Sequence, residues 1–526
     1  MDFNSHEFIH QFLEQSSIFF PDKVALINQK QRITYKEINN QANRLAHKLL
    51  EWGITKGERV ILLLENSLEY VVSYYGVLKA GAVAVPLSTD IKPSGLEFIV
   101  TETNPKIIIT SSKFEKNIQG SKIKGHGIEK VLIRNPKLNW SDNLFSIISW
   151  DEIFNNESYD NPTVSLEDDS LASIIYTSGS MGTPKGVMLS HKNIVSNTHA
   201  ICQYLELSDD DTQMVVLPFF YVMGKSLLNT HFAVGGTVVI NNTFLYPATV
   251  LNQMIDEKVT GFSGVPSTYA YLLHRSPLLS KRDKLSDLRY CSQAGGHMAK
   301  QLKIALRQAL PEQTKIFIMY GATEASARLT YLDPRFFESK IESVGKAIPE
   351  MTIKIIDQEG TELPVGSVGE LVAQGPSIMA GYWKDPGATA KVLDAHGYHT
   401  GDLGYKDQDG FIFITGRKDN QLKVGGHRIN TQEIEDVILE TGLVVEAFVT
   451  GYPDKLLGYK LFVAAVAKKV EANSQTILAA CAQLLPRYKV PERIVLVSSL
   501  PKKLSGKIDK DKCMEIIKKS ISPTDN

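Results

Sequence analysis

The sequence predicts an α/β fold with a large N-terminal domain of mixed and parallel sheets with helices, which includes a β-rich subdomain, and a small α+β C-terminal domain. Three observations lead to this prediction. Short apolar runs alternate with helical patterns up to residue 342, which is typical of parallel sheets. From 343 to 416, short strand patterns are separated by Gly-Ser, Asp-Gly and Gly-Gly turns. From 421 to 526, strand and helix patterns mix. We therefore expect domains at 1–416 and 421–526, joined by a hinge at 417–420.

The composition limits the possible classes of protein. With 526 residues the chain is too long for one ordinary core, so several domains are expected. A net charge of -1 gives no basic excess, which argues against nucleic acid or an anionic membrane as a partner. The four cysteines lie far apart, which disfavours a zinc site or a disulfide scaffold. Because no signal peptide and no membrane-spanning run is recognisable, we expect a cytoplasmic protein.

The first part of the chain alternates between helices and strands. Apolar residues at Ile38, Ala42, Leu45 and Leu49 predict an amphipathic helix over 33–50. A helix at 70–79 between strands at 60–64 and 82–87 indicates a parallel pair. The pattern continues with a short helical or irregular segment and two strands, at 96–101, 106–110 and 130–133. A polar stretch, 135–169, follows.

The strands after residue 170 end in residues suited to ligand binding. The predicted elements are a strand at 171–175, a helix at 191–205, strands at 213–217, 235–240, 259–266, 288–294 and 315–320, C-terminal helices at 433–439 and 477–485, and C-terminal strands at 447–450 and 462–467. Parallel sheets bind ligands beyond the carboxyl ends of their strands. The segments 294–296 and 320–324 lie at such ends and are therefore candidate binding segments.

The segment 176–186, Tyr-Thr-Ser-Gly-Ser-Met-Gly-Thr-Pro-Lys-Gly, has the composition of a phosphate-binding loop. Its glycines allow the backbone N–H groups to approach an anion, its hydroxyls add donors, and Lys185 adds a positive charge. A Walker A loop is excluded, because Pro184, five residues after Gly179, stands where that motif needs its second glycine. Flexible surface loops have similar compositions, so the prediction depends on the rest of the chain.

Eight short motifs occur in order between residues 78 and 508. They are Leu-Lys-Ala-Gly-Ala at 78–82, the segment 176–186, Leu-Pro-Phe-Phe at 217–220, Tyr-Gly-Ala-Thr-Glu at 320–324, Thr-Gly-Asp at 400–402, Gly-Arg-Lys-Asp at 416–419, Lys-Val-Gly-Gly-His-Arg-Ile at 423–429, and Leu-Pro through Gly-Lys-Ile at 500–508. Together they resemble the adenylate-forming superfamily, which includes acyl-CoA synthetases, adenylation enzymes of non-ribosomal peptide synthesis and firefly-type luciferases. The resemblance covers nearly the whole chain.

The resemblance implies an ATP-dependent ligase that joins a carboxylic acid to AMP, releases pyrophosphate and transfers the acyl group to a thiol. The ATP-binding residues that it implies are Thr177, Ser178, Gly179, Ser180, Gly182, Thr183, Gly295, Gly296, Tyr320, Gly321, Ala322, Asp402 and Arg417. The catalytic residues that it implies are Lys507, Glu324, Thr323 and Lys185, with Glu324 and Thr177 holding Mg²⁺. Cations suit a step in which two anions must meet, and Mg²⁺ prefers few, hard oxygen ligands.

Each of the three central residues also has a plainer interpretation. Glu324 has the alternative of a solvated loop carboxylate, and Asp402 that of a turn residue before Gly404. Lys507 has the alternative of one more surface lysine in a lysine-rich tail. Only the resemblance favours the catalytic role of Lys507 over that alternative.

The resemblance further implies that the C-terminal domain is mobile. It would turn about Asp419 between one pose that places Lys507 in the site and another that presents a thiol-acceptor loop containing Lys423, Gly425 and Gly426. The thiol acceptor is coenzyme A or the phosphopantetheine arm of a carrier protein. Too few residues follow Lys507 for a carrier domain, so we expect a separate acceptor molecule.

Nine residues match the positions that line the acyl pocket in the family: Tyr221, Val222, Lys225, Gly264, Ser292, Ala294, Met319, Ala327 and Arg328. Tyr221 stands where amino-acid adenylation domains carry an aspartate for the substrate ammonium, which disfavours an ordinary α-amino acid. Lys225 and Arg328 allow two interpretations. They recognise a second carboxylate or another polar group of the acid, or they face outward or pair with local acidic groups, which we prefer.

The sequence thus favours an AMP-forming ligase that uses a small carboxylic acid, ATP, Mg²⁺ and coenzyme A. The first alternative is a stand-alone adenylation enzyme that loads a separate carrier protein. A luciferase-like oxidoreductase is a more remote alternative, since it adenylates an acid before O₂ attacks it. A non-catalytic nucleotide-binding protein is disfavoured because Lys507 and Glu324 are both present.

Overall fold

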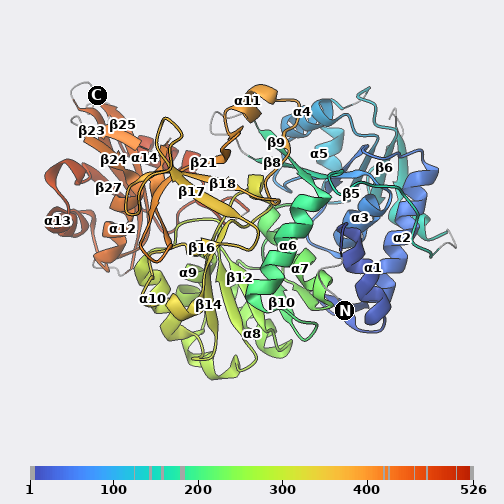
Figure 1. Ribbon diagram of the computed structural model, residues 1–526, viewed down its shortest axis with the longest axis horizontal. Coiled ribbons are helices and arrows are strands. Elements are labelled where there is room, and N and C mark those ends of the chain that lie inside the picture. The colour runs from blue at the N-terminus through green and yellow to red at the C-terminus, as the bar shows by residue number, and fades with distance from the viewer. Residues whose placement is uncertain are drawn as a thin grey trace.

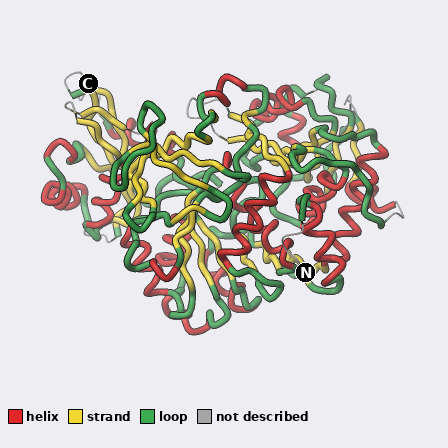
Figure 2. The backbone as a smooth tube through the Cα atoms, viewed as in Figure 1, coloured by secondary structure: helices red, strands yellow, loops and turns green. Residues whose placement is uncertain are grey.

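A computed structural model of the protein describes residues 6–123, 125–140, 145–155, 159–177, 184–418, 421–424, 427–454, 457–468, 472–504 and 506–521. Within these residues the strands form four sheets, two large ones built mainly from residues 24–347 and two smaller ones built from residues 352–496 (Figure 1). Figure 2 shows helices packed around the large sheets and a strand-rich region beside them. The predicted fold class is confirmed.

The first large sheet has the strand order β19-β9-β8-β4-β3-β5-β6-β7. Its strands are β3 (Arg59–Leu63), β4 (Val83–Pro86), β5 (Ile107–Ser111), β6 (Lys130–Arg134), β7 (Ser146–Ser149), β8 (Leu171–Thr177), β9 (Lys185–Ser190) and β19 (Gly381–Tyr382). The strands from β3 to β8 pair in parallel, as the alternation with helices predicted. At the other edge, β9 pairs antiparallel with both β8 and β19.

The second large sheet has the order β16-β15-β14-β13-β12-β10-β11-β1-β2. Its strands are β1 (Val24–Asn28), β2 (Gln31–Thr34), β10 (Thr212–Val215), β11 (Thr237–Ile240), β12 (Gly261–Gly264), β13 (Tyr290–Gln293), β14 (Lys315–Tyr320), β15 (Thr330–Leu332) and β16 (Lys346–Ala347). The strands from β1 to β14 are parallel, and β2, β15 and β16 are antiparallel at the edges. The carboxyl ends of β13 and β14 lead into the glycine segments predicted to bind a ligand.

The two large sheets share one hydrophobic core. Val60 of β3 and Val238 of β11 belong to the same cluster of buried side chains. The surrounding helices are α1 (His10–Phe19), α2 (Tyr35–Glu51), α3 (Leu68–Lys79), α4 (Pro93–Thr103), α5 (Glu115–Gln119), α6 (His191–Leu205), α7 (Val222–Val234), α8 (Pro247–Asp256), α9 (Pro266–Arg275) and α10 (Lys300–Ala309). Helix α2 begins two residues later than predicted. Thr34 caps it, since its hydroxyl accepts from the Glu37 N–H and its own N–H donates to the Glu37 carboxylate.

The predicted polar stretch 135–169 contains two elements that the sequence analysis missed. Strand β7 extends the parallel sheet at its edge beside β6, and a 3-10 helix, η1 (Trp150–Asn155), follows it. The strand has only two apolar residues, Ile147 and Ile148, between two serines. So short a run gives no recognisable periodicity, and pairing with β6 determines its structure.

The third sheet corresponds to the predicted β-rich subdomain. It consists of β17 (Thr352–Ile356), β18 (Gly369–Gln374), β20 (Leu393–Asp394), β21 (Gly397–Lys406) and β22 (Ile412–Arg417), and α11 (Pro386–Ala390) lies in the same stretch of chain. Its strand pairs are antiparallel. Figure 1 shows β17, β18 and β21 in the middle of the molecule, between the first large sheet and the C-terminal elements.

The fourth sheet and three helices form the C-terminal part. They are β23 (Gln421–Val424), β24 (His427–Asn430), β25 (Val444–Asp454), β26 (Gly458–Ala467), β27 (Arg493–Leu496), α12 (Thr431–Glu440), α13 (Ser474–Leu484) and α14 (Lys510–Ser520). The segment 423–429, expected as a loop, instead contributes to two antiparallel strands, β23 and β24. The domain boundaries and the hinge at 417–420 stay predictions. Within the described ranges, no helix has the length and apolar character needed to cross a lipid bilayer.

Candidate active site

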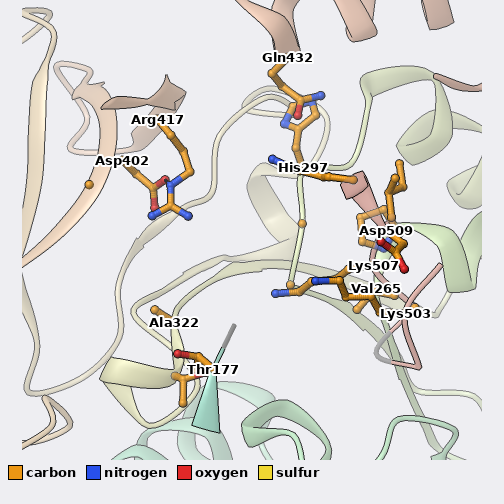
Figure 3. Close-up of a pocket in the computed structure, with 18 of the residues that line it drawn as sticks. Thr177, Val265, His297, Ala322, Asp402, Arg417, Gln432, Lys503, Lys507 and Asp509 are labelled. Carbon is orange, nitrogen blue, oxygen red and sulfur yellow. Dashed lines mark ion pairs between the residues drawn. The ribbon is translucent and has the colours of Figure 1, made fainter. Parts of the chain in front are cut away.

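A cleft of 2160 Å³ lies between the two large sheets, the β-rich sheet and the C-terminal elements (Figure 3). The sequence-predicted residues that line it are Thr177, Lys185, Tyr221, Gly295, Gly296, Gly321, Ala322, Thr323, Glu324, Asp402, Arg417 and Lys507. They come from segments that span more than three hundred positions in the sequence. The fold therefore brings most of the predicted ATP-binding and catalytic side chains to one place.

Thr177 and Lys185 lie at the mouth of a β-hairpin. Thr177 ends β8, Lys185 begins β9, and the two residues are register partners across the antiparallel pair. The predicted phosphate loop therefore joins two strands, whereas a Walker A loop joins a strand to a helix. Its other predicted members, Ser178, Gly179, Ser180, Gly182 and Thr183, lie outside the described residues. Their contacts with phosphate stay predictions.

Glu324 is held by a tyrosine that the sequence analysis did not identify. Glu324 lies in a 3-10 helix, η3 (Thr323–Ala325), directly beyond β14. The hydroxyl of Tyr382 donates to Glu324 Oε1 at 2.9 Å, and the Nζ atom of Lys185 lies 4.8 Å from the centre of the Tyr382 ring. Burial, followed by the Glu324 charge, raises the pKa of Tyr382, so this hydroxyl stays protonated as a donor. Tyr382 thus connects the predicted metal ligand with the predicted phosphate-binding lysine.

No local pattern would have identified Tyr382. It lies 58 residues from Glu324 in a two-residue strand, β19, which reaches the site by pairing with β9. Its neighbour Gly381 has a φ of 141°, and a Cβ atom there would lie 2.9 Å from Thr389 Cγ2. The contact therefore depends on strand pairing across the molecule.

The residues around Glu324 fit a magnesium ion bound together with a nucleotide. The Glu324 carboxylate and the Thr177 hydroxyl both line the cleft, and both are hard oxygen ligands. In the described part of the chain, no cluster of three or more His, Cys, Asp or Glu side chains forms a complete metal site. Mg²⁺ commonly uses one or two carboxylates and completes its shell with phosphate oxygens and water. This donor set suits that mode of binding.

Asp402 faces the cleft from the β-rich sheet and is fixed on two sides. Arg417, its partner across β21 and β22, places Nε 3.1 Å from Asp402 Oδ1, and the Tyr320 hydroxyl donates to Oδ2 at 2.5 Å. Burial raises the pKa of Asp402, while Arg417 and Tyr320 oppose that shift. Each carboxylate oxygen has a second lone pair, so Asp402 can still accept from ribose hydroxyls. Tyr320 supports Asp402 here, and its predicted stacking on adenine stays a prediction.

Lys507 lies at the end of a tight turn that enters the cleft from the C-terminal part. The N–H of Lys503 donates to the Lys507 carbonyl at 2.9 Å, and Gly506 has a φ of 77°. The side chain is solvent-exposed, but it is exposed inside the cleft. Its Cε atom lies 3.6 Å from the point where a Cβ on Gly295 would lie. Desolvation by the cleft walls and then the Arg417 charge lower the pKa of Lys507, whereas Glu324 raises it.

Three contacts hold the turn and helix α12 against the N-terminal part. The Ser267 hydroxyl donates to the Gly506 carbonyl at 2.5 Å, and a Cβ on Gly506 would lie 2.7 Å from Val265 Cγ2. His297 Nε2 lies 2.9 Å from Asp436 Oδ1 of α12. Figure 3 shows Val265 beside Lys507, and His297 near Gln432 of the same helix. The structure therefore has Lys507 inside the cleft. That this pose serves the adenylation step stays a prediction.

The predicted second pose of the C-terminal domain, which would present the thiol-acceptor loop to the site, stays a prediction. Asp419, Gly425 and Gly426 lie outside the described residues. Lys423 lies in β23, opposite Arg428 in the register, and its side chain is outside the described part.

The nine predicted acyl-pocket residues divide into two groups. Tyr221 lines the cleft. The others pack behind it in the N-terminal core: Val222 is partly buried, and Lys225, Gly264, Ser292, Ala294, Met319, Ala327 and Arg328 are buried. Whether these eight contact the acid stays a prediction.

The preferred expectation for Lys225 and Arg328 is wrong. Each side chain keeps only 2% of its surface exposed, so neither faces outward. Among the described residues neither forms an ion pair with a carboxylate. Lys225 contacts the Ser173 hydroxyl at 3.2 Å, and Arg328 donates to the Ala327 carbonyl at 3.3 Å. A positive charge at a helix position is usually solvated, and the sequence does not reveal that α7 is covered on all sides.

Known proteins are similar to this chain in both sequence and architecture. The long-chain-fatty-acid–CoA ligase of Bacillus subtilis is 31% identical over 96% of this chain and 94% of its own. The crystal structure of the anthranilate CoA ligase AuaEII with anthranoyl-AMP superimposes with a TM-score of 0.87, at 25% identity over 98% of both chains. The o-succinylbenzoate coenzyme A synthetase of Bacillus subtilis, in complex with ATP and magnesium, gives a TM-score of 0.80 at 26% identity, over 96% and 99% of the two chains.

The family comparison covers most of the chain. Residues 13–383 match the AMP-binding enzyme family, and residues 433–507 match the AMP-binding enzyme C-terminal domain. The two matches include the β8–β9 hairpin, Glu324 and Lys507. The chain therefore belongs to the AMP-binding enzyme family.

Proposed function

We propose that the protein is an ATP-dependent carboxylic acid–coenzyme A ligase that works through an acyl-adenylate. The observation that supports this most is the meeting of Lys507, Lys185 and Glu324 in one cleft from three distant parts of the chain. In the first half-reaction a carboxylate oxygen of the acid attacks the α-phosphorus of ATP. The bond from that phosphorus to the bridging oxygen breaks, and pyrophosphate leaves.

The charges in the cleft match the needs of this step. Two anions must approach each other, so cations near the reacting atoms lower the barrier. Lys507 reaches across Gly295, and we assign to it contact with both the acid carboxylate and the α-phosphate. Lys185 and Thr177 lie at the mouth of the hairpin. We assign to them the binding of the β- and γ-phosphates. Asp402 accepts from the ribose hydroxyls and thereby positions the nucleotide along the cleft.

Magnesium belongs to the same proposal. Glu324 and Thr177 hold the ion, and Tyr382 keeps the Glu324 carboxylate in place. When bound, Mg²⁺ neutralises phosphate charge and favours the departure of pyrophosphate.

Coenzyme A is the proposed thiol acceptor because the relatives named above are coenzyme A ligases. In the second half-reaction the thiol sulfur attacks the acyl carbon of the adenylate, a thioester forms, and AMP leaves. A carrier protein offers the same terminal thiol on a phosphopantetheine arm and is the competing acceptor. The cytoplasmic location expected from the sequence stays a prediction.

Pyrophosphate release from ATP and Mg²⁺ over a panel of carboxylic acids tests the first half-reaction. We expect release with at least one acid, and an acyl-CoA product by mass spectrometry when coenzyme A is added. Loading of a phosphopantetheinylated carrier protein, with no acyl-CoA formed, would assign the other acceptor. Absence of pyrophosphate release with every acid would contradict the proposal.

A further inference from the structure

Asp402, the carboxylate predicted to bind ribose, lies in a bulge of strand β21. Between Glu370 and Val372 of β18 the register with β21 shifts, and two steps along β18 correspond to four steps along β21. The residues 400–402 therefore bulge out of the regular ladder, with Gly401 at a φ of 72° in their middle. Because β-bulges redirect side chains beside active sites, the position of Asp402 depends on what holds this bulge.

Thr400 holds the beginning of the bulge. Its hydroxyl donates to the Leu371 carbonyl at 2.9 Å and accepts from the N–H of Asp402 at 3.1 Å. Its carbonyl accepts from Arg417 Nη2 at 3.3 Å, and Arg417 also pairs with Asp402 across β21 and β22 (Figure 3). These contacts fix the residue two positions before Asp402 and leave the peptide N–H of Gly401 to another partner.

Glu370 provides that partner, although it belongs to none of the eight motifs. It lies in β18 and is 6% exposed. Its Oε1 atom accepts from the Gly401 N–H at 3.2 Å. Its Oε2 atom lies 2.5 Å from Lys418 Nζ and 3.0 Å from His399 Nδ1. Burial alone raises the pKa of Glu370, but Lys418 and His399 outweigh burial and lower that pKa, so the carboxylate stays charged.

Glu370 therefore holds a neighbour of each member of the Asp402–Arg417 pair. Gly401 directly precedes Asp402, and Lys418 directly follows Arg417. Both members of the pair line the cleft. A carboxylate that binds both neighbours fixes β21 and β22 relative to each other where the pair forms. It thereby also fixes the direction in which the oxygens of Asp402 face the cleft.

His399 restricts Glu370 further. The imidazole lies between two carboxylates, with Nδ1 3.0 Å from Glu370 Oε2 and Nε2 3.1 Å from Asp394 Oδ2. Burial lowers the pKa of His399, but the two carboxylates outweigh burial and raise it. The two oxygens of Glu370 thus face donors from a backbone N–H, a lysine and a histidine. A glutamine at this position would offer one oxygen, and its NH₂ group would face one of these donors.

We propose that Glu370 is a positioning residue that holds Asp402 in place for the ribose hydroxyls and so gives the enzyme its selectivity for ATP over deoxynucleotides. This inference rests on the proposed function, in which Asp402 accepts from those hydroxyls. Glu370 acts through the bulge and not by contact with the nucleotide. An O–H···O hydrogen bond needs an oxygen–oxygen distance of about 2.5–3.0 Å, so a shift of the bulge by about 1 Å breaks it.

Pyrophosphate release with ATP, 2′-deoxy-ATP and 3′-deoxy-ATP tests the proposal in the full-length enzyme, with an acid that supports the reaction. We expect the wild-type kcat/KM to favour ATP over at least one deoxynucleotide by about tenfold or more, because the deoxynucleotide lacks a hydrogen bond to a charged group. Glu370→Gln should lower this ratio by at least about threefold, mainly by raising the KM for ATP. Glu370→Ala, which removes every contact of the carboxylate, should do the same.

Asp407→Asn is the matched control, because it also replaces a carboxylate by an amide on the same hairpin. Asp407 lies in the turn between β21 and β22, where it accepts from the N–H of Phe411 at 2.9 Å and lies 2.7 Å from Lys340 Nζ. This variant should keep the wild-type ratio between the nucleotides.

Three outcomes would overturn the inference while pyrophosphate release still supports the proposed function. They are an unchanged ratio in the folded Glu370 variants, an equal loss of activity with all three nucleotides, and a wild-type enzyme that uses ATP and both deoxynucleotides equally well. If no acid releases pyrophosphate with any nucleotide, the proposed function fails and the inference fails with it.

Discussion

Replacing Lys225 with methionine should raise the thermal stability of the free enzyme, most strongly at low pH. Burial lowers the pKa of Lys225 from 10.5 to about 7 in the folded protein. Below pH 7 the lysine is charged in both states, so the folded state carries the full cost of burying the charge. Between pH 7 and 10.5 the unfolded chain retains a proton that the folded protein has released. The free energy of unfolding of the wild-type protein therefore rises with pH between 7 and 10.5. The Lys225→Met variant has no titrating group at this position and lacks this pH dependence.

The size of the expected gain in stability follows from the shift in the pKa of Lys225. A depression from 10.5 to about 7 corresponds to roughly 5 kcal/mol at about 1.36 kcal/mol per pKa unit. At pH 9 the folded protein holds Lys225 neutral, and the cost of removing the proton from a lysine with a pKa of 10.5 is about 2 kcal/mol. An unfolding entropy of about 2.1 cal/mol/K per residue over 526 residues converts 1 kcal/mol to about 1 °C. Methionine has a similar length and no charge, so it fills the same space.

Thermal unfolding monitored by fluorescence at pH 6 and pH 9 measures this. We expect Lys225→Met to gain on the order of 5 °C at pH 6 and less than half of that at pH 9. As a control, Lys79→Met removes a lysine of α3 that is equally buried but lies 2.5 Å from the Glu14 carboxylate. It should gain less at pH 6 than Lys225→Met, because burial lowers the pKa of Lys79 only to about 8 and the variant leaves the partly buried Glu14 carboxylate without its partner. A melting temperature of Lys225→Met below that of wild type at pH 6, or a gain independent of pH, would refute the assigned cost of burying Lys225.

Three further substitutions test the cleft. Lys185→Ala should slow pyrophosphate release but leave acyl-CoA formation from supplied acyl-AMP intact, and equal loss in both steps would argue against a phosphate role. Tyr382→Phe removes the hydrogen bond to Glu324 and should raise the Mg²⁺ requirement by about tenfold, whereas an unchanged magnesium titration would contradict its supporting role. Gly506→Ala should impair adenylation more than thioester formation, because φ is 77° and Val265 lies within 2.7 Å of the added methyl group; wild-type adenylation would show that the turn tolerates a side chain.

The parts of the fold with strong local patterns could be predicted. The helix α6 coincides with the predicted 191–205, and the parallel order of β3 and β4 followed from the helix between them. Elements that depend on tertiary pairing could not be predicted, as β7 shows at the edge of its sheet and the β23–β24 pair in the C-terminal part.

The site residues also divide into those that a local motif predicts and those that only tertiary pairing brings to the site. Lys507, Glu324 and Asp402 occur in recognisable motifs, and the structure places all three in the cleft. Tyr382 reaches Glu324 only through the pairing of β19 with β9. The burial of Lys225 also escaped prediction, because the groups that surround it come from α3 and β8, far away in the sequence.

ATP–pyrophosphate exchange in the presence of the preferred acid tests acyl-adenylate formation most directly. We expect the wild-type enzyme to exchange label only when the acid is present, and Lys507→Ala to lose most of that exchange while still binding ATP. Its partial reaction from supplied acyl-AMP to acyl-CoA should persist. Exchange that continues undiminished in Lys507→Ala would contradict the role of this lysine. The absence of exchange with any acid in the wild-type enzyme would contradict adenylation itself.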